Sequence, residues 1–184
     1  QGYFALGLLD DCGACVLWDG FFNGGAPIVA DIMNAMTHPL AVILILLGGA
    51  VNGTKLVAVA AMILSGVAQW VWAKVLRLSW LPRMWGAALA TVGGYMVGRL
   101  EGGLSEIMLS IASFSLVIAI AVHLYRTARR QVAVALGIIT GLAFLSGQGY
   151  MQLAFLLGIC PAFLILLIDR KIKVRPIWKE FALA

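Results

Sequence analysis

Charged residues are scarce in this sequence. Of its 184 residues, only 11% are Asp, Glu, Lys or Arg, whereas 62% are hydrophobic. A soluble domain is nearer a quarter charged and about half apolar. A soluble fold of this size could not bury so much apolar surface, so the composition excludes an ordinary soluble domain and predicts a protein whose solvent is lipid. The 13 Lys and Arg residues form no basic stripe, so no nucleic-acid partner is expected.

A recognisable leader is also missing. The chain begins at Gln1, and no basic segment precedes an apolar run, so the pattern of a signal peptide is not seen. We therefore expect the chain to be part of a longer protein, with at least one segment upstream.

Apolar runs of membrane length, or close to it, occur five times. They cover Leu56 to Leu76, Met84 to Leu100, Leu104 to Tyr125, Val132 to Ser146 and Tyr150 to Ile168. An earlier run, Pro39 to Val51, is too short to cross about 30 Å of hydrocarbon and is predicted to be an interfacial or re-entrant helix. The predicted fold is all-α: a polytopic transmembrane helical bundle of about five spans plus a short interfacial helix.

Charge orients these spans. If residues 1–55 lie outside the cytoplasm, five crossings place three basic segments inside. These contain 11 of the 13 basic residues: Lys74, Arg77, Arg83, Arg126, Arg129, Arg130, Arg170, Lys171, Lys173, Arg175 and Lys179. This arrangement obeys the positive-inside rule. The sequence therefore predicts an integral cell-membrane protein with an acidic extracytoplasmic loop and juxtamembrane helix (1–55), a five-span bundle (56–169), and a basic cytoplasmic segment (170–184) leading into a further part.

The predicted outer loop carries four acids and no base between residues 10 and 40. These acids and a nearby histidine could bind a hard cation such as Mg²⁺, Mn²⁺ or Ca²⁺: Asp10, Asp11, Asp19, Asp31 and His38. Their spacing matches no known metal-binding loop, and solvated acids are the plain alternative. The aromatic Trp18 could help to form a platform for a sugar or lipid, or it could seat the loop on the bilayer.

Cysteine is limited to three residues. Cys12 and Cys15 form a Cys-x-x-Cys pair that would suit thiol–disulfide exchange, a local disulfide, or two unpaired thiols. The adjacent Asp10 and Asp11 would raise the pKa of a thiol and so oppose a reactive thiolate. A quinone-coupled relay would require a second pair, but Cys160 stands alone.

Polar residues at the outer ends of three predicted helices could converge on this loop. They are Glu101, Glu106, Gln148 and Gln152, and they could equally be helix ends that face water. Arg99 is the clearest base on this side for binding a phosphate, with Lys55 as a second possibility.

Three segments carry a family resemblance. Trp18 to Asp31 reads W-D-G-F-F-N-G-G-A-P-I-V-A-D, His38 to Leu40 reads H-P-L, and Ser146 to Gln152 reads S-G-Q-G-Y-M-Q. In order and topology these resemble YfhO-like membrane proteins, which belong to the GT-C class of polyprenyl-phosphate-sugar glycosyltransferases. The chain departs from that pattern where Asp19 replaces Asn, Gly20 replaces Pro, and Gln148 replaces His.

The resemblance implies a GT-C-like fold that transfers a sugar from a polyprenyl-phosphate donor at the outer membrane face. It implies that an acid of the first loop acts as a general base on the acceptor hydroxyl, or helps to hold a divalent cation, Mg²⁺ or Mn²⁺. The acids available for this role are Asp10, Asp11 and Asp31, although the family's acid could also lie upstream of Gln1. The substrate-binding candidates are Trp18, His38, Arg99, Glu101, Glu106 and Gln148.

Two other functions stay open. The chain could be a non-catalytic subunit or assembly factor that uses its acidic loop to dock other membrane protein subunits. It could also be a membrane thiol oxidoreductase acting through Cys12 and Cys15. The expected partners of the glycosyltransferase are membrane lipid and the polyprenyl-phosphate sugar.

Overall fold

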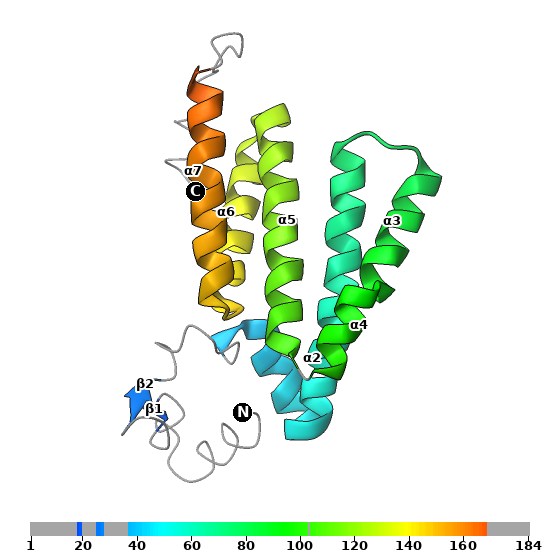
Figure 1. The fold of residues 1–184 in the computed structure, drawn as a ribbon, viewed down its shortest axis with the longest axis vertical. Helices are drawn as coiled ribbons and strands as arrows, with labels where there is room; N and C mark the ends of the chain where they lie inside the picture. The colour runs from blue at the N-terminus through cyan, green and yellow to red at the C-terminus, as the bar shows by residue number, and fades with distance from the viewer. Residues whose placement is uncertain (1–17, 20–24, 28–36, 103, 169–184) are drawn as a thin grey trace.

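The computed structural model describes residues 18–19, 25–27, 37–102 and 104–168, and this part of the chain is almost entirely helical. The helices are α2 (Pro39–Val75), α3 (Trp80–Val92), α4 (Gly94–Glu101), α5 (Ser105–Thr127), α6 (Arg130–Leu145) and α7 (Gly149–Ile168). Two strands of two residues each, β1 (Trp18–Asp19) and β2 (Ala26–Pro27), pair antiparallel with Trp18 opposite Pro27. Figure 1 shows the long helices side by side and alternating in direction. The predicted helical fold class is confirmed.

Helix α2 consists of two arms that meet at Gly49. This glycine has φ 72° and ψ 179°, a backbone conformation that other residues adopt only with strain. A Cβ atom built on Gly53 would lie 2.5 Å from the Cα atom of Ile45, so the arms touch through their backbones. In a straight helix, residues eight apart are separated by about 12 Å along the axis. The structure thus separates a short arm from a long one, as predicted, but it places the break at Gly49 and includes residues 52–55 in the long arm.

The predicted span from Met84 to Leu100 is not one helix. Helix α3 ends at Val92 and α4 begins at Gly94, because Gly93 adopts an extended conformation with φ −60° and ψ 145°. Small residues let α3 approach α2 closely. A Cβ atom on Gly66 of α2 would lie only 3.2 Å from the Ala87 carbonyl oxygen.

Helix α5 holds the two hydrophobic clusters together. Figure 1 shows it between α2 and α6. The first cluster joins α2, α4 and α5 and contains Ala41, Ile45, Val57, Ala61, Met96, Met108 and Leu109. The second joins α5 and α6 and contains Phe114, Val117, Leu124, Ala133, Leu136 and Ala143. The Phe114 ring also contacts the Phe155 ring of α7, with centroids 5.1 Å apart.

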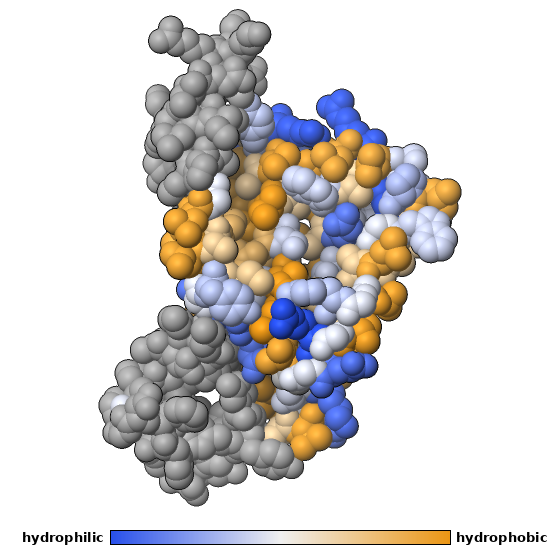
Figure 2. Space-filling model, in the orientation of Figure 1, coloured by the Kyte–Doolittle hydropathy of each residue, from blue (hydrophilic) through white to orange (hydrophobic). Residues whose placement is uncertain are grey.

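Much apolar surface stays outside these clusters. Helices α2 and α5 are long and apolar enough to cross a membrane, and only 28% of the most apolar window of α2 is buried. Helix α3 has no buried residue, and its Trp80 and Trp85 are about two-thirds exposed. Figure 2 shows apolar side chains over much of the visible face. Such a surface is typical of a protein that contacts lipid or another protein.

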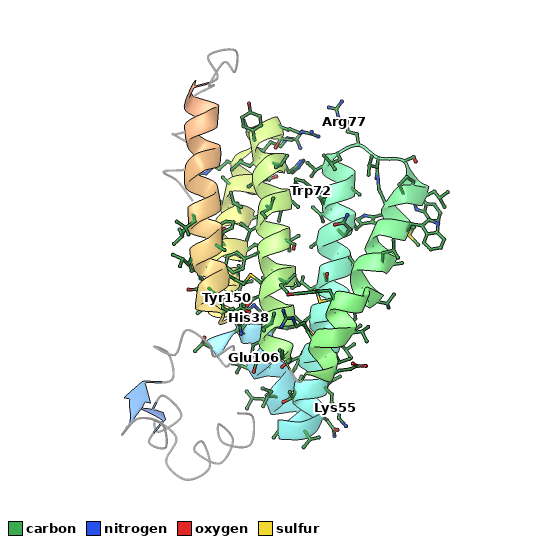
Figure 3. The ribbon with its side chains drawn as sticks, in the orientation of Figure 1. His38, Lys55, Trp72, Arg77, Glu106 and Tyr150 are labelled. Atoms are coloured by element: carbon green, nitrogen blue, oxygen red, sulfur yellow. The ribbon has the colours of Figure 1, made fainter. Side chains whose placement is uncertain are left out.

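Charge is segregated between the two ends of the bundle. One end, here called the basic end, lies where α2 and α5 finish and α3 and α6 begin, and it carries Lys74, Arg77, Arg83, Arg126, Arg129 and Arg130. The opposite end, called the His38 end, contains the start of α2, the start of α5 and the turn between α6 and α7. Figure 3 shows Arg77 at the basic end and His38, Glu106, Tyr150 and Lys55 toward the other.

Candidate functional site

His38 closes the first turn of α2. It is the N-cap residue, and its Nδ1 atom accepts a hydrogen bond from the Leu40 backbone N–H at 3.2 Å. Pro39 follows at the first helical position, where its missing N–H costs nothing. Since Nδ1 is the acceptor, the neutral imidazole carries its proton on Nε2. His38 is only 4% exposed, so it belongs to the interior of this end.

A second contact joins this cap to a segment distant in the sequence. The Thr37 hydroxyl donates a hydrogen bond to the Leu145 carbonyl oxygen at 3.4 Å, across 108 residues. Leu145 is the last residue of α6, and Ser146 follows as its C-cap. The H-P-L segment and the S-G-Q-G-Y-M-Q turn therefore lie at the same end of the bundle.

Two buried serines and one buried glycine join α5 to the α6–α7 turn at the His38 end. The Ser110 hydroxyl of α5 lies 2.8 Å from the Ser146 hydroxyl, and it also approaches the carbonyl oxygens of Ser146 at 3.2 Å and Gly147 at 3.4 Å. Ser146 in turn donates to the Ala143 carbonyl oxygen at 2.6 Å. Neither serine has any exposed surface. A chain of hydrogen bonds thus fixes the α6–α7 turn against α5.

Gln148 is held in an unusual backbone conformation within that turn. Its φ is 117°, a value that residues with a side chain rarely adopt, and its carbonyl oxygen accepts hydrogen bonds from the N–H groups of Met151 and Gln152. Its side chain is 6% exposed. The side-chain amide has no hydrogen-bond partner among the residues that the structure describes. Buried amides normally are paired, so this group is available to a ligand or to a segment outside the described residues.

The other predicted residues differ in how far they join this cluster. Glu106 lies in the first turn of α5, half-buried at the His38 end, where the helix dipole favours a carboxylate. Arg99 instead faces its own helix: its Nη2 donates to the Tyr95 hydroxyl at 3.1 Å, and its guanidinium lies 4.9 Å from the Tyr95 ring centre. Glu101 is exposed at the end of α4. Neither Arg99 nor Glu101 has a hydrogen bond to His38 or Gln148.

The structure describes only some of the loop residues that were predicted to act in catalysis, metal binding or thiol chemistry. Asp10, Asp11 and Asp31 lie outside the described residues, as do Cys12 and Cys15. Trp18 belongs to β1, of which only the backbone is described. In the part of the chain that can be examined, no three His, Cys, Asp or Glu side chains gather to bind a metal ion.

Sequence reasoning missed Ser110. It stands inside an apolar run, and a lone serine there is not distinguished from Ser113, which bonds to the Leu109 carbonyl of its own helix. The one available signal was its position less than two turns from the outer start of the predicted span, the side on which the polar S-G-Q-G turn is also predicted.

Comparisons with protein-family models, with curated proteins and with solved structures find no match for this chain. The features that point to a function are therefore the contacts at the His38 end and the resemblance in three short segments.

Acid should weaken the cap at His38. Burial lowers the pKa of its imidazole below the usual value of about 6.5. The unfolded chain then binds the proton more readily than the folded one, so stability is full above about pH 7.5 and falls as pH drops through about 6.5. We expect the thermal midpoint to fall more between pH 8 and pH 5.5 in the wild type than in His38→Asn, which keeps a capping side chain but does not titrate. Equal losses in the two proteins would contradict this assignment.

Proposed function

We propose that this chain is part of an integral membrane glycosyltransferase that uses a polyprenyl-phosphate sugar as donor. The observation that carries the proposal is the meeting of two resemblance segments at one end of the bundle. Thr37 and His38 lie beside the α6–α7 turn, and buried polar groups from both segments are concentrated there. Buried polar groups in so apolar a bundle are costly unless they are hydrogen-bonded, and polar groups inside a membrane often mark a functional site.

In this proposal, about five helical spans of the bundle cross the membrane. Besides α2 and α5, helix α7 has 20 residues and would be about 30 Å long, while α3 and α4 together run from Trp80 to Glu101. Helix α6 has 16 residues and would need its polar ends at the interfaces. Under the positive-inside rule, the basic end would face the cytoplasm and the His38 end would lie outside.

The proposed reaction is a direct transfer at the outer face. A carboxylate among Asp10, Asp11 and Asp31 takes the proton of the acceptor hydroxyl, and the acceptor oxygen attacks the anomeric carbon of the donor sugar. The bond between that carbon and the phosphate oxygen breaks, and polyprenyl phosphate leaves. A bound Mg²⁺ or Mn²⁺ would take its ligands from the loop carboxylates and would supply charge neutralisation at the phosphate.

The side chains around the turn would position the sugar. The Gln148 amide offers both donors and an acceptor for sugar hydroxyls, and His38 offers its Nε2 proton. Trp18 and Glu106 would line the mouth together with Glu101. Arg99, at the end of α4, is the described cation best placed in sequence to approach a donor phosphate, and it would have to leave its Tyr95 partner to do so.

Gln148→Gly is the variant that tests this proposal. Glycine tolerates φ 117° better than glutamine, so we expect stability to be kept or raised by up to about 1 kcal/mol. Transfer should nevertheless fall by about tenfold or more, because hydrogen bonds to the sugar are lost. The assay supplies a panel of polyprenyl-phosphate hexoses and pentoses to membranes that contain the full-length protein, and it measures released polyprenyl phosphate.

Controls separate the alternatives. Gln131→Ala, at the exposed start of α6 near the basic end, should leave transfer unchanged. At least one of Asp10→Asn, Asp11→Asn and Asp31→Asn should abolish transfer if the general base lies within this chain. If folded protein turns over no donor in the panel, the enzyme proposal fails, and stable co-purification with a larger complex would then support the docking subunit. If the Cys12→Ser/Cys15→Ser variant cannot replace the wild-type protein in cells, that result would instead support a membrane thiol oxidoreductase.

A further inference from the structure

The geometry points to a binding site for the phosphate of an anionic phospholipid headgroup at the basic end, formed by Arg77 and Arg126. These two arginines and Leu76 line a shallow, open depression of about 390 Å³. The depression lies at the opposite end of the bundle from His38 and Gln148, as the Arg77 label in Figure 3 indicates. It is therefore distinct from the candidate sugar site and does not depend on it.

Arg77 occupies a position where glycine is usual. Helix α2 ends in a Schellman motif: the Leu78 N–H bonds to the Ala73 carbonyl and the Arg77 N–H to the Lys74 carbonyl, each at 3.0 Å. The residue at the left-handed position of this motif is most often glycine, yet here it is Arg77 with φ 60°. A side chain at this position costs about 1 kcal/mol in backbone strain. The guanidinium is exposed, so packing in the described bundle does not offset this strain energy.

Arg126 brings a second guanidinium to the same place. It lies in the last turn of α5, and its Nη1 donates a hydrogen bond to the Val75 carbonyl oxygen at the end of α2. That bond uses one of five N–H donors and fixes the side chain beside the Arg77 turn. The remaining donors are suited to the oxygens of a phosphate, which arginine binds in a forked geometry.

The surroundings favour an anionic lipid over a soluble anion. Six cations gather at this end, and no ion pair is found among the residues that the structure describes. Glu101 and Glu106, the acids with described side chains, lie at the other end. Exposed Trp80 and Trp85 follow Arg77 in the sequence, and tryptophan is enriched where membrane proteins meet the headgroup region. A basic depression flanked by such residues is suited to a headgroup phosphate whose acyl chains lie along the apolar surface.

Lipid titration of purified full-length protein in dodecyl maltoside tests this site. Phosphatidylglycerol should raise the thermal midpoint of the wild type more than phosphatidylcholine does, and native mass spectrometry should show retained phosphatidylglycerol. Arg77→Asn should raise the phosphatidylglycerol concentration needed for half of this effect by about tenfold, because asparagine tolerates the left-handed conformation but removes the cation. Lys55→Gln removes the same charge at the opposite end and should leave the titration unchanged.

Three results would overturn the assignment. They are equal titrations for Arg77→Asn and Lys55→Gln, equal stabilisation by the two phospholipids, and full reproduction of the effect by inorganic phosphate at the same concentration. Arg126→Gln also loses the bond to Val75 and should lower stability without lipid. The rise in its thermal midpoint with phosphatidylglycerol is therefore measured from its own lipid-free midpoint. This rise should be reduced as in Arg77→Asn.

Discussion

Replacing Gly53 by alanine is expected to prevent the chain from reaching its native fold. The new Cβ atom would lie 2.5 Å from the Ile45 Cα atom and 2.7 Å from the Leu44 carbonyl oxygen, both backbone atoms that no rotamer change can move. Overpacking of this kind costs about 3 kcal/mol, a large share of the total stability of a small domain. The arms of α2 would have to separate, and the contacts of Ala41 and Ile45 in the first cluster would be lost.

Gly141→Ala is the matched control for this variant. Gly141 lies within α6, and a Cβ atom there would meet nothing within 4 Å. Because alanine is the better helix former, Gly141→Ala should be neutral or stabilising by up to about 1 kcal/mol. The yield of monodisperse protein in size-exclusion chromatography, followed by unfolding in mixed detergents, measures both variants. A Gly53→Ala protein as stable as Gly141→Ala would show that the arms of α2 are not in contact.

The second large effect is expected at Ser110. Ser110→Ala should cost about 2 kcal/mol, because it leaves a cavity in a site without exposed surface and removes the hydrogen bond to the Ser146 hydroxyl. Ser113→Ala should cost less, since the Ser113 hydroxyl bonds only to the Leu109 carbonyl of its own helix. The difference between these equally small changes reports the contact between α5 and the α6–α7 turn.

A double-mutant cycle isolates that contact. The coupling energy between Ser110→Ala and Ser146→Ala should be about 1 kcal/mol, within the range measured for side-chain hydrogen bonds between membrane helices. A coupling near zero, with Ser110→Ala and Ser113→Ala equally destabilising, would mean that the two serines pack without stabilising each other. The measurement is the free energy of unfolding in mixed detergents for the wild type, both single variants and the double variant.

The helical class and the cap of α2 could be predicted because both depend on local signals. Low charge and long apolar runs specify helices in lipid, and His38 followed by Pro39 is a recognisable helix start. The separation of a short helix from a long one was also predicted from length. The position of the break could not be predicted, because Gly48, Gly49 and Gly53 could each form the hinge. Only the structure, in which Ile45 lies against Gly53, places the break at Gly49.

The polar cluster could be predicted only in part. The sequence singles out Glu106 and Gln148 as residues at the outer ends of helices and His38 as a candidate metal ligand or substrate-binding residue, and the structure places all three at one end of the bundle. Ser110 was not predicted because its role depends on a partner 36 residues away, and one-dimensional periodicity carries no information on that pairing. The break at Gly93 was missed for a related reason: within a run rich in small residues, one glycine gives no distinct signal.

The central place of α5 has a consequence for the order in which the protein assembles during synthesis. Met108 and Leu109 of α5, and Met96 of α4, supply the largest side chains of the first cluster. The hairpin of α2 and α3 is synthesised first, and it lacks these core side chains until α4 and α5 follow. The same helix α5 also presents Phe114 and Val117 for α6. The synthesis of one helix thus completes the first cluster and supplies the surface on which the second cluster is built.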